Sequence, residues 1–126
     1  MRQEDKTETI LESSSKFVTQ LYKDQQPLWA VYHDLLHTIE TFNASLEIGG
    51  GSGLSKEELE IVTVSAWFHD TGYLFMVDGH EEKSSEIALD FLQKNEYPVE
   101  KINDIINCIL TKNDIISIFN PQSALT

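Results

Sequence analysis

The histidines of this chain are spaced in a way that could bind a metal ion. His33 and His37 lie four residues apart, so a helix would place both side chains on one face. His69 and Asp70 are adjacent and close an apolar run, and His80 follows shortly after them. A carboxylate beside a core is costly unless it is paired or bound to a metal. Imidazole and carboxylate together suit Mn, Fe, Ni or Zn, and a carboxylate with water also suits Mg. A divalent cation at the His-Asp pair is therefore expected.

An all-helical domain is predicted to position these residues. Apolar residues recur at helical spacing, and no segment shows the two-residue alternation of a strand. We expect a compact bundle of about five to six helices. The first predicted helix covers residues 7–24 and is broken at 25–27, and the second runs from about Val31 to about Leu46. The third begins at Ser55, the fourth covers residues 81–95, and the fifth begins at Pro98. Residues 115–119 are predicted to form a short further turn.

The third helix carries the clearest local signals. Ser55 and Glu58 predict a capping box, in which each side chain accepts a hydrogen bond from a free backbone N–H of the other residue. The residues that follow are apolar nearly all round, which is typical of a helix in the middle of a domain. Gly72 is expected to end this helix in a left-handed conformation. Residues 49–53, a glycine-rich run, are interpreted as a flexible connector. They lack the lysine and the preceding strand of a phosphate loop.

Composition limits the function further. The chain has 126 residues, which predicts one domain over 1–126, with 1–6 disordered. One cysteine and no apolar run of membrane length favour a cytoplasmic protein. The net charge of −12 argues against long nucleic acid as a partner. A small phosphorylated ligand remains compatible if a metal ion supplies positive charge.

Three segments in this order resemble the HD superfamily of metal-dependent phosphohydrolases, which is named for its paired His-Asp. They are YHDLLHT at 32–38, AWFHDTGY at 66–73 and GHEEKSS at 79–85. The resemblance covers about residues 27–111 and is closest to the small single-domain members of the superfamily. It implies an all-helical fold and a divalent metal cofactor.

The resemblance also assigns roles to individual residues. It makes His37, His69 and Asp70 metal ligands, with Asp70 also orienting or deprotonating the attacking water. His33 resembles the histidine that protonates the leaving oxygen in cyclic-nucleotide phosphodiesterases of the superfamily. His80 resembles a histidine that lines the site or binds a second metal ion in several branches.

The chain departs from the family pattern at the fourth ligand. The family uses a further aspartate in a later helix, and no matching motif occurs before Thr126. Asp114 is the nearest candidate, and it falls too early for the pattern. We therefore expect the C-terminal part of the family domain to be missing, and the alternative is that the chain has lost this ligand. An apolar face uncovered in this way would be covered by a partner or by a homodimer.

These observations predict a metal-dependent phosphohydrolase that acts on a small phosphoester of the nucleotide class. The alternative is an HD-type module that senses a nucleotide with little or no turnover, which the missing fourth ligand favours. A metalloprotease fits poorly. The segment from His33 to His37 has the two-histidine spacing of a zinc protease, but Asp34 stands where the longer glutamate base is needed, and His69 and Asp70 are left unexplained.

Overall fold

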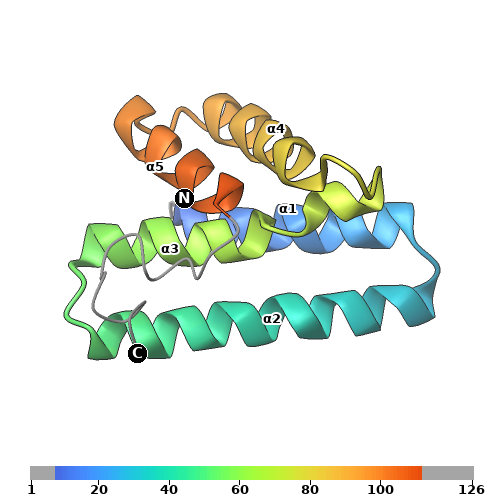
Figure 1. Cartoon of the computed structure of the whole chain (residues 1–126), viewed down its shortest axis with the longest axis horizontal. Helices are drawn as coiled ribbons and strands as arrows, with labels where there is room; N and C mark the ends of the chain where they lie inside the picture. The colour runs from blue at the N-terminus through green and yellow to red at the C-terminus, as the bar shows by residue number, and fades with distance from the viewer. Residues whose placement is uncertain (1–7, 112–126) are drawn as a thin grey trace, which may run out of the picture.

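The chain folds into a bundle of helices in the computed structural model, which describes residues 8–111 (Figure 1). Over this range there are five α-helices, one short 3-10 helix and no strand, which confirms the predicted all-helical class. The predicted turn at 115–119 and the ligand candidate Asp114 lie outside the described residues. The elements are α1 (Ile10–Gln25), α2 (Leu28–Gly51), α3 (Lys56–Phe68), η1 (Thr71–Leu74), α4 (His80–Lys94) and α5 (Val99–Leu110).

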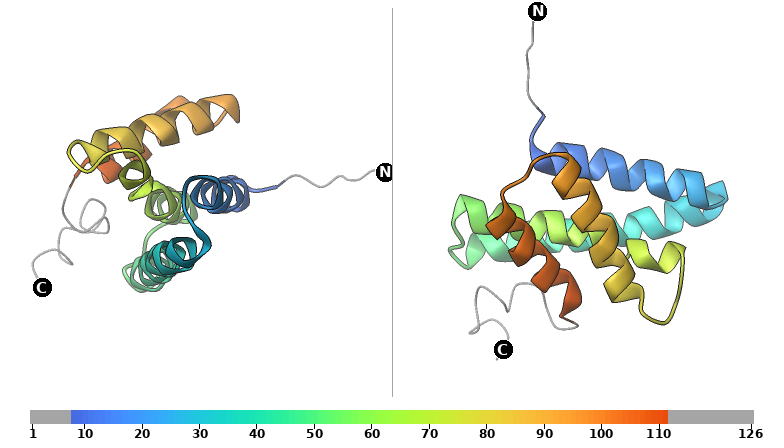
Figure 2. Two further views of the ribbon diagram at one scale, coloured as in Figure 1. Left: turned by 90° about the vertical axis from the view of Figure 1, so that its right-hand side faces the viewer. Right: turned by 90° about the horizontal axis from the view of Figure 1, so that it is seen from above.

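Helix α3 runs through the centre of the bundle. Every residue from Ile61 to Phe68 is buried, as its apolar sequence predicts. The predicted capping box is present: the Glu58 amide donates to the Ser55 hydroxyl at 3.1 Å, and the Ser55 amide donates to the Glu58 carboxylate at 2.9 Å. Figure 2 shows α2 on one side of α3 and α4 with α5 on the other, with α1 alongside. The buried core contains thirteen apolar side chains, four of them from α3 itself. Phe17 and Phe91 pack on Phe68 at the edge of this core.

The first two helices meet at Pro27. Helix α1 starts at Ile10 with a second capping box, between Thr9 and Glu12, that the sequence reasoning overlooked. Helix α2 begins at Leu28, three residues before the predicted start. Pro27 fits that position because its fixed φ suits a helix entry and its carbonyl accepts from the amides of Ala30 and Val31.

The glycine run is helical, so the predicted flexible connector at 49–53 is wrong over most of its length. Helix α2 continues through Gly51, and only Gly53 has a positive φ, of 80°. Each glycine in a helix costs about 1 kcal/mol relative to alanine. Packing offsets this cost, because Ser45 and Gly49 are buried on the side of α2 that faces the bundle. The Ser52 amide adds bonds to the carbonyls of Ile48 and Gly49.

The chain turns sharply where α3 ends, and the predicted role of Gly72 is wrong. Helix α3 stops at Phe68, and His69 keeps a right-handed conformation with φ −60° and ψ −29°. Gly72 lies in η1 and is not among the residues with positive φ. A Cβ atom on Gly72 would lie 2.0 Å from the carbonyl oxygen of His80. Glycine is needed here for close packing of η1 on α4.

None of the helices that the structure describes combines the length and the apolar character that crossing a membrane requires.

Candidate metal centre

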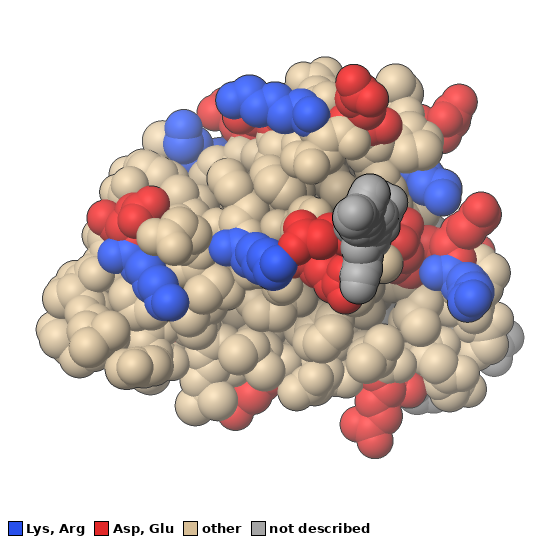
Figure 3. All heavy atoms as spheres, turned by 180° about the vertical axis from the view of Figure 1, so that it is seen from behind, with Lys and Arg blue, Asp and Glu red and all other residues tan. Residues whose placement is uncertain are grey.

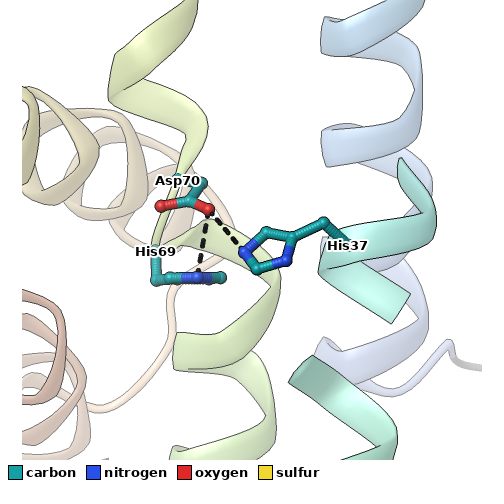
Figure 4. Close-up of side chains that lie close together, drawn as sticks. All are labelled: His37, His69 and Asp70. Carbon is teal, nitrogen blue, oxygen red and sulfur yellow. Dashed lines mark ion pairs between the residues drawn. The ribbon is translucent and has the colours of Figure 1, made fainter. Parts of the chain in front are cut away.

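Three predicted ligands meet at the end of α3. Asp70 lies between the two imidazoles, with Oδ2 3.1 Å from Nε2 of His37 and 3.2 Å from Nε2 of His69 (Figure 4). One donor atom from each residue lies within 4.8 Å of the others. His37 comes from α2, while His69 and Asp70 follow directly after α3. The structure therefore brings together residues 32 and 33 positions apart, as a shared metal site requires.

His69 is held so that one particular ring nitrogen faces the centre. Its Nδ1 lies 2.7 Å from the carbonyl oxygen of Ala66. A carbonyl oxygen can only accept, so Nδ1 carries the proton and Nε2 is directed toward Asp70. A backbone carbonyl on one nitrogen fixes the tautomer that leaves the other nitrogen available to a metal ion.

The two distances from Asp70 to the histidine nitrogens fit a shared divalent ion. Bonds of about 2.1 Å at angles between 90° and 109° put neighbouring ligand atoms about 3.0–3.4 Å apart. Asp70 Oδ2 lies at such distances from both histidine nitrogens. Two imidazoles and one carboxylate suit Mn, Fe, Ni or Zn better than Mg, which prefers an oxygen-rich set. Three protein ligands leave further positions for water or substrate.

The candidate metal centre opens into a cavity of about 410 Å³, which His37 and Asp70 help to line. His33, on the same helix as His37, contributes to the wall, so this predicted site residue lies beside the three ligands. None of the residues that line the cavity is a lysine or an arginine. The lining residues are Tyr22, His33, Asp34, Leu36, His37, Glu40, Asp70, Tyr73 and Leu74.

His80 lies apart from the three-ligand group. Its ring stacks on Tyr73, with centroids 3.7 Å apart and planes inclined by 17°. Its Nδ1 is 3.2 Å from the carbonyl oxygen of Val77. His80 therefore contacts the wall of the cavity through Tyr73. The donor atoms that lie close together are those of His37, His69 and Asp70.

Two residues at this site escaped the sequence reasoning. The Ser84 hydroxyl donates to the carbonyl oxygen of His69 at 3.0 Å and accepts from the Gly72 amide at 2.8 Å. It therefore ties α4 to the segment that carries His69 and Asp70, two of the three candidate ligands. Tyr22 lines the cavity from α1, where it sits four residues after the buried Val18 on the same helix face. In the sequence, Tyr22 occupies an ordinary core position of an amphipathic helix, and its hydroxyl group alone does not indicate a place in a functional site.

The charges at the centre stabilise one another. Burial opposes the charged form of His69, but the hydrogen bond and attraction of Asp70 outweigh it and raise the pKa of His69 above 6.5. Burial also disfavours the Asp70 carboxylate, yet the hydrogen bond from His69 and the nearby His37 hold its pKa below 3.8. Without metal, the pair therefore forms an ion pair at mildly acidic pH.

The stability of the metal-free protein should depend on pH through this pair. Because the folded protein lowers the pKa of Asp70, this carboxylate contributes stability to the folded state above its ordinary pKa of 3.8, and that stability is lost in stronger acid. Because the folded protein raises the pKa of His69, the charged imidazole contributes its full stability below pH 6.5, and that stability is lost as the pH rises through the raised pKa. In excess chelator, the melting temperature should thus fall from about pH 5.5 to about pH 8.5 more steeply in the wild type than in Asp70→Asn. Parallel melting profiles for the two proteins would contradict the ion pair.

Comparisons of the chain with protein-family models, with curated proteins and with solved structures found no significant match.

Proposed function

We propose that the chain is a metal-dependent phosphohydrolase that acts on a small phosphoester of the nucleotide class. One observation carries the proposal: His37, His69 and Asp70 converge at a cavity that also contains His33. The cavity volume of about 410 Å³ lies in the range of small-molecule sites, which is about 300–1,000 Å³.

The charges around the cavity favour a metal-dependent reaction. Asp34, Glu40 and Asp70 contribute carboxylates, and no lysine or arginine lines the wall. These carboxylates would repel a phosphate group, so added positive charge would favour its binding. A divalent ion held by the three ligands would supply that charge and acidify a nearby water molecule. The Nδ1–H bond from His69 to Ala66 keeps the ligand nitrogen pointed at the site throughout.

The other wall residues have complementary roles in this proposal. His33 donates a proton to the oxygen of the leaving group. Burial raises the pKa of Tyr22 to about 12, so its phenol keeps its proton and can donate to a phosphoryl oxygen. Leu36, Tyr73 and Leu74 offer an apolar wall for the rest of the substrate.

The role of His33 predicts a dependence on the leaving group. With an alkyl phosphoester, His33→Gln should lower kcat by about 10²- to 10⁴-fold, because the alkoxide must leave without its proton. With a nitrophenyl ester the loss should be small, since that leaving group needs no acid. Steady-state kinetics on both substrates, with metal content measured in parallel, make the test. Equal losses on both substrates would refute the general-acid role.

The proposal as a whole is tested by phosphate release from a panel of nucleotides with Mn, Fe, Ni, Zn or Mg. Activity should require a metal ion and should be lost in His69→Ala and Asp70→Ala. Asp90→Asn is a matched control, because Asp90 pairs with Lys94 on the surface of α4 and does not line the cavity at the metal centre. Activity that survives both ligand substitutions would refute this site.

A nucleotide-sensing module is the second candidate. It is favoured because only three donor residues, two histidines and one aspartate, converge among the residues that the structure describes. Titration calorimetry distinguishes the two: a sensor binds a nucleotide in the presence of metal and forms no product over hours, whereas an enzyme turns it over.

A further inference from the structure

Helix α2 carries a row of large apolar side chains on its outer surface. They are between 39% and 76% exposed: Leu28, Trp29, Tyr32, Leu36, Ile39 and Leu46. Figure 1 shows α2 along the lower edge of the bundle, with α1 and α3 on its inner side. The row is thus left open by the helices that the structure describes.

These side chains form one continuous stripe. Positions 28, 32, 36, 39, 43, 46 and 50 follow spacings of four or three residues. At about 100° per residue they fall within an arc of about 80° and extend over about 33 Å. The last four spacings are those of the a and d positions of a coiled coil. We call positions 28, 29, 32, 36, 39, 43, 46 and 50 the α2 stripe.

The α2 stripe is uncharged in a strongly acidic chain. Asn43 and Gly50 fill the two positions that are not large and apolar, and none of the eight residues is ionisable at neutral pH. Figure 3 shows an uncharged surface at the lower left, over the first part of α2. Two stripes could therefore meet through uncharged side chains, with Glu40 and Glu47 along one edge of the contact, although each chain carries a net charge of −12.

The area of the α2 stripe is sufficient for a dimer. Taking about 100 Å² of exposed surface for each of the six large side chains, one stripe presents about 600 Å². Such an area is at the upper limit for the largest apolar patch of a monomer. Two stripes in contact would bury about 1,200 Å², which exceeds the roughly 1,000 Å² expected of a specific interface.

We propose that a second copy of this chain covers the α2 stripe, with the two α2 helices antiparallel about a twofold axis near Ile39. The side chains at one end of the α2 stripe are large and those at the other end are smaller, so the two ends can pack against each other. Trp29 and Tyr32 are bulky, whereas a Cβ atom on Gly50 would have nothing within 4 Å. Antiparallel packing lays the aromatic end of one helix over Leu46 and Gly50 of the other. The same surface then serves both copies, as a twofold interface requires.

The interface would adjoin the metal centre. Leu36 belongs to the α2 stripe and also lines the cavity, and His33 and Glu40 lie on the neighbouring side of the same helix. The second copy therefore forms part of the edge of the cavity. A dimer would contain two such cavities, one on each side of the paired helices.

Sedimentation velocity from about 1 to 100 μM tests the proposal. The wild type should form dimers, and Tyr32→Glu and Ile39→Glu should each raise the dissociation constant at least 100-fold. Ile48→Glu is the matched control: Ile48 is on the same helix, is 44% exposed and lies off the stripe. All three positions are exposed, so the variants should keep the wild-type circular dichroism. A wild type that stays monomeric, or a dimer that all three variants leave intact, overturns the proposal.

Cross-linking tests the orientation. A Leu28→Cys chain mixed with a Gly50→Cys chain should give the disulfide-linked heterodimer under mild oxidation, because antiparallel packing brings these positions together. The native Cys108 is buried and should not interfere. Linkage of Leu28→Cys only to itself would indicate parallel helices and overturn the antiparallel arrangement. If another protein or residues outside the described range cover the α2 stripe, the chain should stay monomeric and no disulfide-linked dimer should form, which would overturn the proposal.

Discussion

A Gly72→Ala variant is expected to lose about 3 kcal/mol or more of its free energy of unfolding. The added methyl group would lie 2.0 Å from the carbonyl oxygen of His80 and 2.8 Å from the amide nitrogen of Ser84. Both are backbone atoms in the first turns of α4, so they cannot move without displacing the helix. The Ser84 hydroxyl, also 2.8 Å away, would be pushed from its bonds to Gly72 and His69.

Urea unfolding followed by circular dichroism measures this loss. Gly51→Ala is the matched control, because a Cβ atom there meets nothing within 4 Å and the residue is helical. That control should be neutral or more stable by up to about 1 kcal/mol. If Gly72→Ala were as stable as Gly51→Ala, the close contact between η1 and α4 would be wrong.

An Asp70→Asn variant is expected to lose at least 100-fold in affinity for a divalent ion. Asparagine keeps the size of the side chain but removes the negative charge that lies between His37 and His69. The wild type should gain about 2.7 kcal/mol of stability at a metal concentration 100 times the dissociation constant. For a domain of this size, at about 3–6 °C per kcal/mol, that gain raises the melting temperature by about 8–16 °C.

Calorimetry and thermal melting with and without metal measure both effects. Asp90→Asn removes a surface carboxylate of α4 and should keep the full metal-dependent shift. His37→Ala should also lose the shift, because His37 links the ion to α2. An Asp70→Asn protein that melted later with metal, as the wild type does, would exclude the three-ligand site.

Much of the fold could be predicted because its signals are local. The capping box of Ser55 and the all-apolar sequence of α3 depend on neighbouring residues, and both predictions are confirmed. The meeting of His37 with His69 and Asp70 was predicted from motif order, and the geometry bears out their proximity. The binding of a metal ion, the identity of that ion and the activity remain predictions.

The errors came from contacts between distant segments. Helix α2 extends through Gly51 because its end packs on the bundle, and glycine propensity alone does not reveal that packing. Gly72 is needed because the backbone of His80 comes within reach, eight residues further along the chain. The Ser84 bridge and the wall position of Tyr22 likewise exist only after the helices have assembled.

The placement of the three ligands also has a topological consequence. His69 and Asp70 follow directly after the central helix α3, whereas His37 belongs to α2, at one edge of the bundle, and its side chain is 60% exposed. An ion bound to all three would act as a removable cross-link that closes a loop between positions 37 and 69. Closing a loop of this length in the unfolded chain is worth about 3–4 kcal/mol in the chain-entropy picture of a disulfide. Metal availability would then set how firmly α2 is attached to the rest of the protein, in the way that redox state does for a cystine.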